Sequence, residues 1–246
     1  CNTALELGLH KEKVVDAKTP FFLCELRIRV FDAIYVHDKY VSTYLGRPPR
    51  ISYRHCIVQS PADLSDDEVC GDQARLTDAI SRLDNGYATS GRIYRATMRR
   101  AQIADFIIRE EILEIVLGNP HSSIDSRVHE IRERIQKSGE EMPVFLRVNP
   151  EERLRTGISF EIPGRKAAWR RLDIFWILAI HCERRYTDFL LERALVRRSK
   201  SKVDPARLIA AARSMLDLTL KWKANSEYFQ NQECMVERVR LRQQHT

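Results

Sequence analysis

Residues 19–49, TPFFLCELRIRVFDAIYVHDKYVSTYLGRPP, contain the start and the end of one long helix and decide the fold class. Thr19-Pro20 places a hydroxyl at the N-cap and a proline in the first turn, which is typical of a helix start. Gly46 stands where a helix needs a left-handed residue to end, and Pro48-Pro49 prevents continuation. Between these signals, apolar residues recur at spacings of three, four or their sums, which predicts one buried stripe. The stripe consists of Leu23, Leu26, Val30, Ile34, Val41 and Leu45.

Charged residues on this helix fall off the stripe, and we predict that Arg29, Asp32 and Lys39 are solvated. Arg47 leaves the helix where the chain reverses, and Asp38 lies about two turns before the helix end. An ion pair between them, or hydrogen bonds from Arg47 to the helix end, would fix the direction of exit. The alternative is that both are exposed, where ion pairs contribute only ~0–1 kcal/mol. Either way, the sequence predicts a structural role.

Similar start and stop signals predict helices over most of the chain. We expect them at 73–83, 91–117, 123–138, 165–196 and 204–222, and an extended linker at 50–70 pinned by Ile51 and 57–58. Only 157–162 alternates weakly with period two, and a single strand makes no sheet. The predicted class is therefore all-α, an antiparallel array of about six to eight helices. We expect one helical domain over 1–225 and a polar tail over 226–246.

Composition is that of an ordinary globular protein, with 43% hydrophobic and 30% charged residues. Lys and Arg number 41 against 34 Asp and Glu, a net charge of +7, which permits contact with nucleic acid. Because the basic residues are mostly interleaved with acids, we favour a solvated helical surface over a phosphate-binding face. The longest near-apolar stretch, 174–180, is far shorter than the ~20 residues of a membrane span, and no signal peptide is evident.

The six cysteines are scattered along the chain, without the close pairs of a structural zinc site. They are Cys1, Cys24, Cys56, Cys70, Cys182 and Cys234. A chain of this length can build a core without disulfides, so we expect reduced, mostly buried thiols and a cytosolic or nuclear protein. The chain begins at Cys1, and 4–9 has the pattern of a helix already under way. We therefore expect an N-terminally truncated fragment with an exposed apolar patch near Leu5, Leu7 and Leu9.

Several patterns resemble chemical sites, but each has a simpler structural interpretation. The glycine spacing of 86–92 is that of a phosphate-binding loop, but the required lysine and preceding strand are missing, so we predict a flexible turn. His181-Cys182 are adjacent on a helix and point apart, which makes Cys182 a core residue rather than a nucleophile. His129 and Glu133 could hold a metal, but two ligands without a third favour a surface hydrogen bond.

Two charged runs also have a simple interpretation. Glu110, Glu111 and Glu114 lack a paired histidine in the sequence, so we predict that they are solvated. The basic run 197–202 could be a nuclear-import signal or a phosphate contact, although we favour a solvated loop. No set of residues combines a base, a nucleophile and an electrophile. The sequence therefore predicts no catalytic residues, no metal ligands and no enzyme.

Three stretches resemble a known family in the order in which they occur: ELRIRVF at 25–31, DKYVS at 38–42 and LGRPPRI at 45–51. Together they resemble the middle segment of the fungal-specific transcription factor domain, the regulatory region of fungal zinc binuclear-cluster transcription factors. The signature residues, to which we assign structural roles, are Arg27, Phe31, Asp38, Ser42, Leu45, Gly46, Arg47, Pro48 and Pro61. The paired alanines of 207–220 resemble a later helix of the family. Position 32 is aspartate where the family often has a large aromatic residue.

The resemblance implies a helical regulatory domain of a nuclear transcription factor that controls RNA polymerase II transcription. In such proteins, six clustered cysteines hold two zinc ions and read DNA. We expect that cluster, its zinc and the DNA contact to lie upstream of this chain, and no cofactor within it. The implied partners are co-regulator proteins, a second copy of the chain or a small-molecule effector, with no membrane. The alternatives are a helical scaffold or adaptor unrelated to DNA and, less favoured, an unrecognised helical enzyme.

Overall fold

The computed structural model describes residues 1–11, 19–57, 59–118, 124–147, 171–198 and 205–224. Within these residues, nearly every element is a helix, which confirms the all-α class. The α-helices are α1 (Asn2–Glu6), α2 (Phe21–Leu45), α3 (Asp66–Val69), α4 (Gln73–Ser81), α5 (Arg95–Leu117), α6 (Ile124–Glu140), α8 (Arg171–Arg198) and α9 (Ala206–Ala224). A 3-10 turn, η1 (Tyr53–His55), and a hairpin of β1 (Leu83–Asp84) and β2 (Tyr87–Ala88) complete the set. None of the described helices has the length and apolar composition needed to cross a bilayer.

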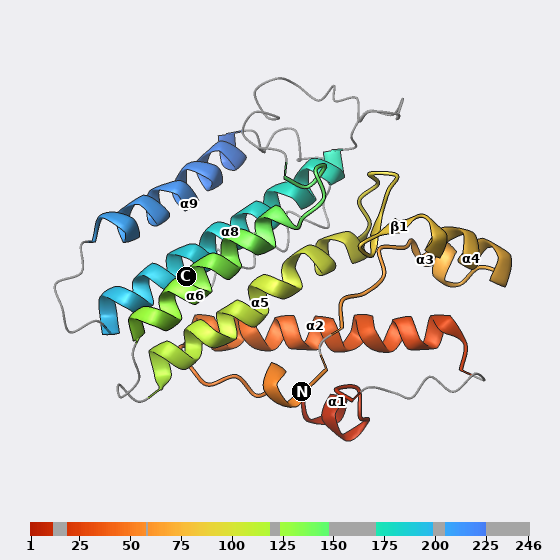
Figure 1. The fold of residues 1–246 in the computed structure, drawn as a ribbon, viewed down its shortest axis with the longest axis horizontal. Coiled ribbons are helices and arrows are strands. Elements are labelled where there is room, and N and C mark those ends of the chain that lie inside the picture. Colours follow the sequence, from red (N-terminus) through yellow and green to blue (C-terminus); the bar gives the residue numbers. More distant parts are fainter. Residues whose placement is uncertain (12–18, 58, 119–123, 148–170, 199–204, 225–246) are drawn as a thin grey trace.

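Helix α5 is the centre of the array. It packs between α2 and α8, α9 covers the far side of α8, and α6 lies against both α5 and α8 (Figure 1). Apolar residues from α5 enter separate core clusters with α2, with α6 and α8, and with α8 and α9. Since neighbours cover several of its faces, even charged residues of α5 become buried, as Asp105, Arg109 and Glu110 are. A helix covered in this way needs partners for its polar groups.

Helix α2 buries the face opposite to the predicted one. Most of the predicted stripe is exposed, including Leu26 (52%) and Val30 (39%), whereas Asp32 and Lys39 are buried. The buried apolar residues of α2 that meet α5 are Phe31, Tyr35 and Val36. Both faces of α2 carry apolar residues at helical spacing, so periodicity alone cannot select the buried one. Partners on α5 and in the segment after α2 determine which face is buried. The predicted buried stripe of α2 was therefore wrong.

The end of α2 was predicted correctly and its start only in part. Gly46 is left-handed, with φ 62° and ψ 36°, and the backbone N–H of Arg47 donates to the Ser42 carbonyl at 3.0 Å. This six-to-one hydrogen bond closes the helix in the manner of a Schellman motif. At the start, no side chain caps the helix; instead the Pro20 carbonyl accepts from the N–H of Leu23 at 3.1 Å. The proposed Thr19 hydroxyl cap is therefore not formed.

The predicted turn after α4 is a hairpin. Asn85 and Gly86 have φ of 48° and 79°, and Asp84 pairs with Tyr87 across them. Asn-Gly between short strands is the typical two-residue hairpin turn because both positions require positive φ. The buried carboxylate of Asp63 accepts from the N–H of Ala88 at 2.9 Å and holds the hairpin against the linker. The sequence predicts a flexible turn over 86–92, whereas Asn85 and Gly86 form an ordered hairpin turn just before it.

The linker 50–70 is more ordered than predicted. Ile51 is buried, as expected, but Ile57 is 45% exposed. The acidic run 66–68 forms the first turn of α3, where negative charge is favourable. Ser65 caps this helix in a reciprocal pair with Glu68, its hydroxyl accepting from the Glu68 N–H at 3.2 Å. Residue 58, the candidate strand 157–162, the tail 226–246 and Cys234 lie outside the described residues.

Asp32 is a buried carboxylate without a hydrogen bond among the described residues. Both of its oxygens lack a partner, and the nearest cation, the Arg99 Nε, is 4.0 Å away. Desolvation by burial raises the pKa of Asp32 to about 7, against which Arg99 acts only partly. The folded protein therefore favours the protonated form. The contribution of the protonated Asp32 to the free energy of unfolding is fully present below about pH 4. It is lost as the pH rises through about 7.

Asp32→Leu, a replacement of similar shape, should raise the free energy of unfolding by about 1–4 kcal/mol at pH 8, because a buried charge without a partner is removed. At pH 5 the gain should be smaller, since the native carboxyl is then already protonated. Urea unfolding at the two pH values measures both effects. Asp217→Leu, at an exposed position of α9, is the control and should show no such pH dependence. An equal gain at both pH values would contradict the assignment.

Candidate functional site

The signature residue Asp38 holds the segment that follows the Leu-Gly-Arg-Pro turn. Its carboxylate is buried and accepts from the backbone N–H groups of Arg50 and Ile51 at 3.1 Å. Lys39 donates to the Ile51 carbonyl. An extended segment outside a sheet has backbone groups that must find other partners when buried, and α2 supplies them. The direction of exit is thus fixed by Asp38, whereas Arg47, for which this role was predicted, is exposed.

Lys39 completes a buried ion cluster, which we define as Asp38, Lys39 and Glu110. Its ammonium lies 3.0 Å from Asp38 Oδ2 and 3.1 Å from Glu110 Oε2, and its side chain is wholly buried. Glu110 also accepts from the Tyr35 hydroxyl at 2.8 Å and from the Tyr53 N–H at 3.2 Å. The prediction that Lys39 and Glu110 are solvated was wrong. The cluster joins α2, α5 and η1, and each charge in it has a partner.

The other signature residues divide between core, helix end and surface. Phe31 and Ser42 are buried, and the Arg27 guanidinium donates to the Gly8 carbonyl at 3.2 Å, which ties α2 to the turn after α1. Pro61 is buried, and its carbonyl accepts from Arg100 at 3.0 Å. Leu45, Gly46, Arg47 and Pro48 are exposed. Within the described residues, the buried signature residues thus pack in the core or hold neighbouring segments, and none of them lines the space between α6, α8 and α9.

A second buried charge joins α5 to α8. Arg109 is wholly buried; its Nη2 lies 2.6 Å from Glu183 Oε2, and its Nε donates to the Thr187 hydroxyl at 2.9 Å. The guanidinium also lies over the rings of Tyr40, Phe106 and Tyr186. Glu111, likewise predicted to be solvated, is buried and pairs with Arg134 of α6 at 2.6 Å. The glutamates of α5 therefore hold neighbouring elements.

The contacts of His181-Cys182, of His129 with Glu133 and of Arg198 in the basic run are as follows. Desolvation by burial, together with Glu183, raises the pKa of the Cys182 thiol to about 11, and the ring of His181 is bonded to the Leu146 carbonyl at 2.9 Å. His129 and Glu133 form the predicted surface pair at 3.2 Å. Arg198 donates to the Val116 carbonyl at the end of α5, so this member of the basic run caps a helix.

The thiols are less buried than predicted. Among the described cysteines, Cys1 and Cys70 are exposed, and the others are half-buried. At the N-terminus, Leu7 is 64% exposed, while Leu5 and Leu9 are half-buried, so the predicted apolar patch is present only at Leu7.

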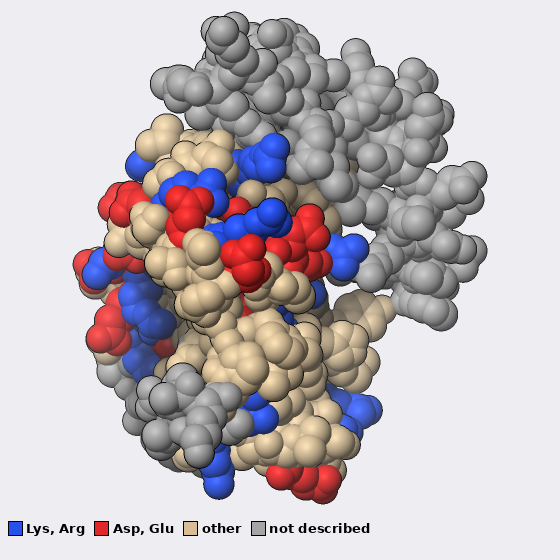
Figure 2. All heavy atoms as spheres, turned by 90° about the vertical axis from the view of Figure 1, so that its right-hand side faces the viewer, with Lys and Arg blue, Asp and Glu red and all other residues tan. Residues whose placement is uncertain are grey.

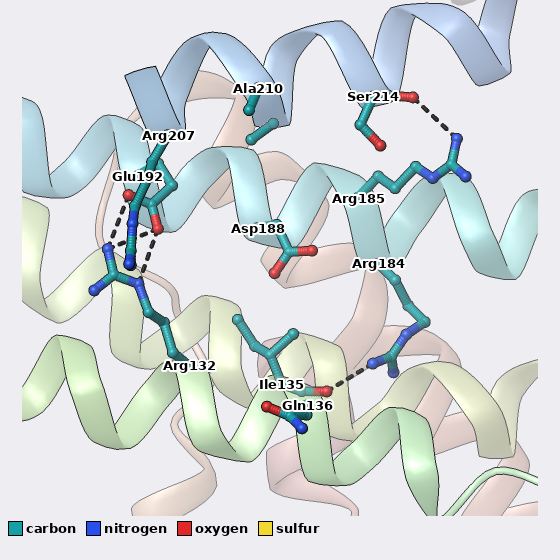
Figure 3. Close-up of a pocket in the computed structure, with 11 residues that line it drawn as sticks. Arg132, Ile135, Gln136, Arg184, Arg185, Asp188, Glu192, Arg207, Ala210 and Ser214 are labelled. Atoms are coloured by element: carbon teal, nitrogen blue, oxygen red, sulfur yellow. Dashed lines mark hydrogen bonds and ion pairs between the residues drawn. The ribbon is translucent and has the colours of Figure 1, made fainter. Parts of the chain in front are cut away.

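A cavity of about 540 Å³ lies between α6, α8 and α9 and is the candidate binding site. The residues that line it from α8 are charged, whereas those from α9 are small apart from Arg207 (Figure 3). The lining residues are Arg132, Ile135 and Gln136 of α6, Arg184, Arg185, Asp188 and Glu192 of α8, and Arg207, Ala210, Ala211 and Ser214 of α9. Its size is within the range of small-molecule sites.

Small residues of α9 make room for this cavity. Ala210, Ala211 and Ser214 line it from α9. Helix α6, expected over 123–138, continues to Glu140, and a Cβ at Gly139 would come within 2.6 Å of the Arg184 guanidinium. None of the cavity residues was among the predicted site residues. The alanines of α9 were the one available signal, since small residues on a helix otherwise amphipathic leave space beside it.

The fold and this site define an all-helical domain with a polar cavity between α6, α8 and α9. The family described as Fungal specific transcription factor domain matches residues 1–123, half of the chain. The chain therefore belongs to this family, as its signature residues suggested. A comparison with curated proteins and one with solved structures give no match. The matched half contains α1 to α5, whereas the cavity is formed by helices beyond it.

Proposed function

We propose that this chain is the regulatory domain of a fungal zinc-cluster transcription factor that acts in the nucleus on RNA polymerase II transcription. The family match over 1–123 is the observation that carries the proposal. DNA is read by a zinc cluster that is not part of these residues, and the chain itself requires no cofactor. It acts by binding rather than by catalysis. The raised pKa of Cys182 argues only against this thiol as a nucleophile, because a thiol that stays protonated reacts poorly.

The exposed face of α2 supports a role in protein association. Its apolar residues follow one side of the helix for most of its length, and they are Phe22, Leu23, Leu26, Val30, Val41, Tyr44 and Leu45. Figure 2 views the molecule from the end at which α2 begins and shows acidic and basic side chains interleaved on the upper part of that face. An apolar strip of this length suits helix-to-helix packing. A second copy of the chain is the partner we propose for it, and a co-regulator protein is the alternative.

A reporter assay tests the regulatory role. The chain, fused to a heterologous DNA-binding domain, should raise or lower expression from the matching promoter severalfold relative to that DNA-binding domain alone. Expression equal to that of the DNA-binding domain alone would contradict the proposal and favour a scaffold unrelated to DNA.

The α2 face has its own test. Leu26→Glu and Val30→Glu change exposed positions, so the thermal midpoint should stay within about 2 °C, since such substitutions are usually within ±0.5 kcal/mol. If a second copy binds there, both variants should shift the chain from dimer to monomer in sedimentation. Ile209→Glu, at a similarly exposed apolar position of α9, is the matched control. A monomeric native chain would exclude self-association.

A further inference from the structure

Helix α2 exposes its apolar side chains and buries its charged ones. Its six Lys, Arg, Asp and Glu residues are all buried or half-buried, whereas none of its nine exposed residues is of these types. A surface helix normally has the opposite arrangement, with charged residues facing water. The exposed residues, which we call the α2 strip, are Phe22, Leu23, Leu26, Val30, Ala33, His37, Val41, Tyr44 and Leu45. A long apolar strip on a helix at the edge of the array (Figure 1) is typical of an interface.

The α2 strip is nearly symmetric about the middle of its helix, where Ala33 lies. When the helix is aligned with its own reverse, exposed positions fall opposite exposed positions. The pairs are Phe22 with Leu45, Leu23 with Tyr44, Leu26 with Val41, and Val30 with His37. A two-fold interface requires this match, because a residue i that contacts j of the second copy is itself contacted by residue j of that copy.

Side-chain size along the α2 strip suits two copies that cross at the middle. Ala33 is the smallest residue of the strip, and the two ends carry Phe22 and Leu23, and Tyr44 and Leu45. Two packed helices are closest where they cross, at about 8–10 Å between axes, and diverge on either side. Small side chains at the crossing and large ones at the ends fill this space. A second copy brings a second alanine to the crossing, which an unrelated helix need not do.

The α2 strip also has the area that a dimer needs. Its seven large apolar side chains are 39–66% exposed. With side-chain areas on the order of 150–200 Å² each, they offer roughly 500–700 Å² per copy, or about 1,000–1,400 Å² for a pair. Specific interfaces begin at about 1,200 Å² in total. The strip therefore supports a dimer of modest affinity, with a dissociation constant on the order of micromolar.

We propose that two copies of the chain pair through α2 in antiparallel orientation, about a two-fold axis close to Ala33. Leu26 then packs against Val41 of the partner subunit, and Val41 packs against Leu26 of the partner subunit. The inference rests on the self-association proposed above for this face and adds its orientation and register.

Complementary charges test this register. Leu26→Glu or Val41→Lys alone should weaken the dimer about tenfold or more in sedimentation equilibrium, because each places a charge against apolar side chains twice per dimer. The double variant Leu26→Glu with Val41→Lys should dimerise at least about fivefold more tightly than either single variant, since each glutamate then meets a lysine. In a parallel pair, glutamate would face glutamate, and the double variant would dimerise more weakly than the single ones.

The matched control is Leu26→Glu with Val30→Lys, which introduces the same charges at two exposed positions. In the proposed register, position 30 faces His37 of the partner subunit, so the control should dimerise no better than Leu26→Glu alone. Thermal unfolding shows that each variant is folded. Equal recovery by the control, or no recovery by Leu26→Glu with Val41→Lys, would overturn the inference.

The α2 pair and the regulatory role can fail separately. A native chain that stays monomeric at concentrations far above micromolar would overturn the α2 pair, while an active reporter fusion would still support the regulatory role. Recovery of the dimer by the charge pair together with a silent reporter fusion would support the α2 pair and contradict the regulatory role.

Discussion

Lys39→Met should lower the free energy of unfolding by about 3–5 kcal/mol, because it leaves two carboxylates buried without their cation. Lys39 is wholly buried between Asp38 and Glu110, at 3.0 and 3.1 Å. Methionine retains much of the volume and removes the charge, so the loss measures electrostatics more than packing. It also removes the donor to the Ile51 carbonyl, which should loosen the segment after α2. Urea unfolding measures the change.

The control is Lys137→Met, which removes a lysine of the exposed i,i+4 pair with Glu141 and should change stability by less than about 0.5 kcal/mol. The double variant Lys39→Met with Glu110→Gln tests the cause. If a lone buried carboxylate is responsible, its loss should be smaller than the sum of the single losses by about 0.5–3 kcal/mol. A loss equal to that sum would point to packing instead.

The sequence predicted the helical class well because its signals are local. Gly46 and the two prolines after it end α2 through their own backbone restrictions, and the structure shows that end in detail. The start and extent of α4 and the end of α5 follow from similar signals. Such signals act within a few residues of the element that they define. They hold whatever the rest of the fold does.

The buried face of α2 could not be predicted in the same way. Lys39 and Asp32 are charged, and a rule based on hydrophobic spacing assigns them to solvent. Lys39 is nevertheless buried because Glu110, 71 positions later in the chain, provides a counter-charge. Such a pair has no local signature. The same holds for Arg109 and Glu183, which meet only when α5 packs on α8.

The cavity is even harder to predict from the sequence, because it is a space that side chains leave unfilled. Its charged residues belong to three helices and lie as far apart as Arg132 and Arg207 in the sequence. Only the small residues of α9 hint at space, and they do not show which charged residues face it. By contrast, the family was recognised from the short stretches around Gly46, since those contain the helix end and the residues that dock the chain after it.

Arg109→Met should destabilise the chain by about 3–5 kcal/mol, as it removes the buried cation that holds α5 against α8. Glu183 would lose its partner at 2.6 Å, Thr187 would lose a donor at 2.9 Å, and the stacking against Phe106 would go with them.

The test of Arg109→Met rests on a matched pair of variants. Arg75→Met, at a position 81% exposed with an ion pair to Asp72, should change the free energy of unfolding by less than about 0.5 kcal/mol. Adding Glu183→Gln to Arg109→Met should recover part of the loss, because no lone carboxylate then remains in the α5–α8 interface. Hydrogen exchange gives the location: amides of α5 and α8 should lose protection first, since their contact is the one weakened. A loss below 1 kcal/mol, or protection lost first in α2, would show that α5 and α8 are held together chiefly by their apolar contacts.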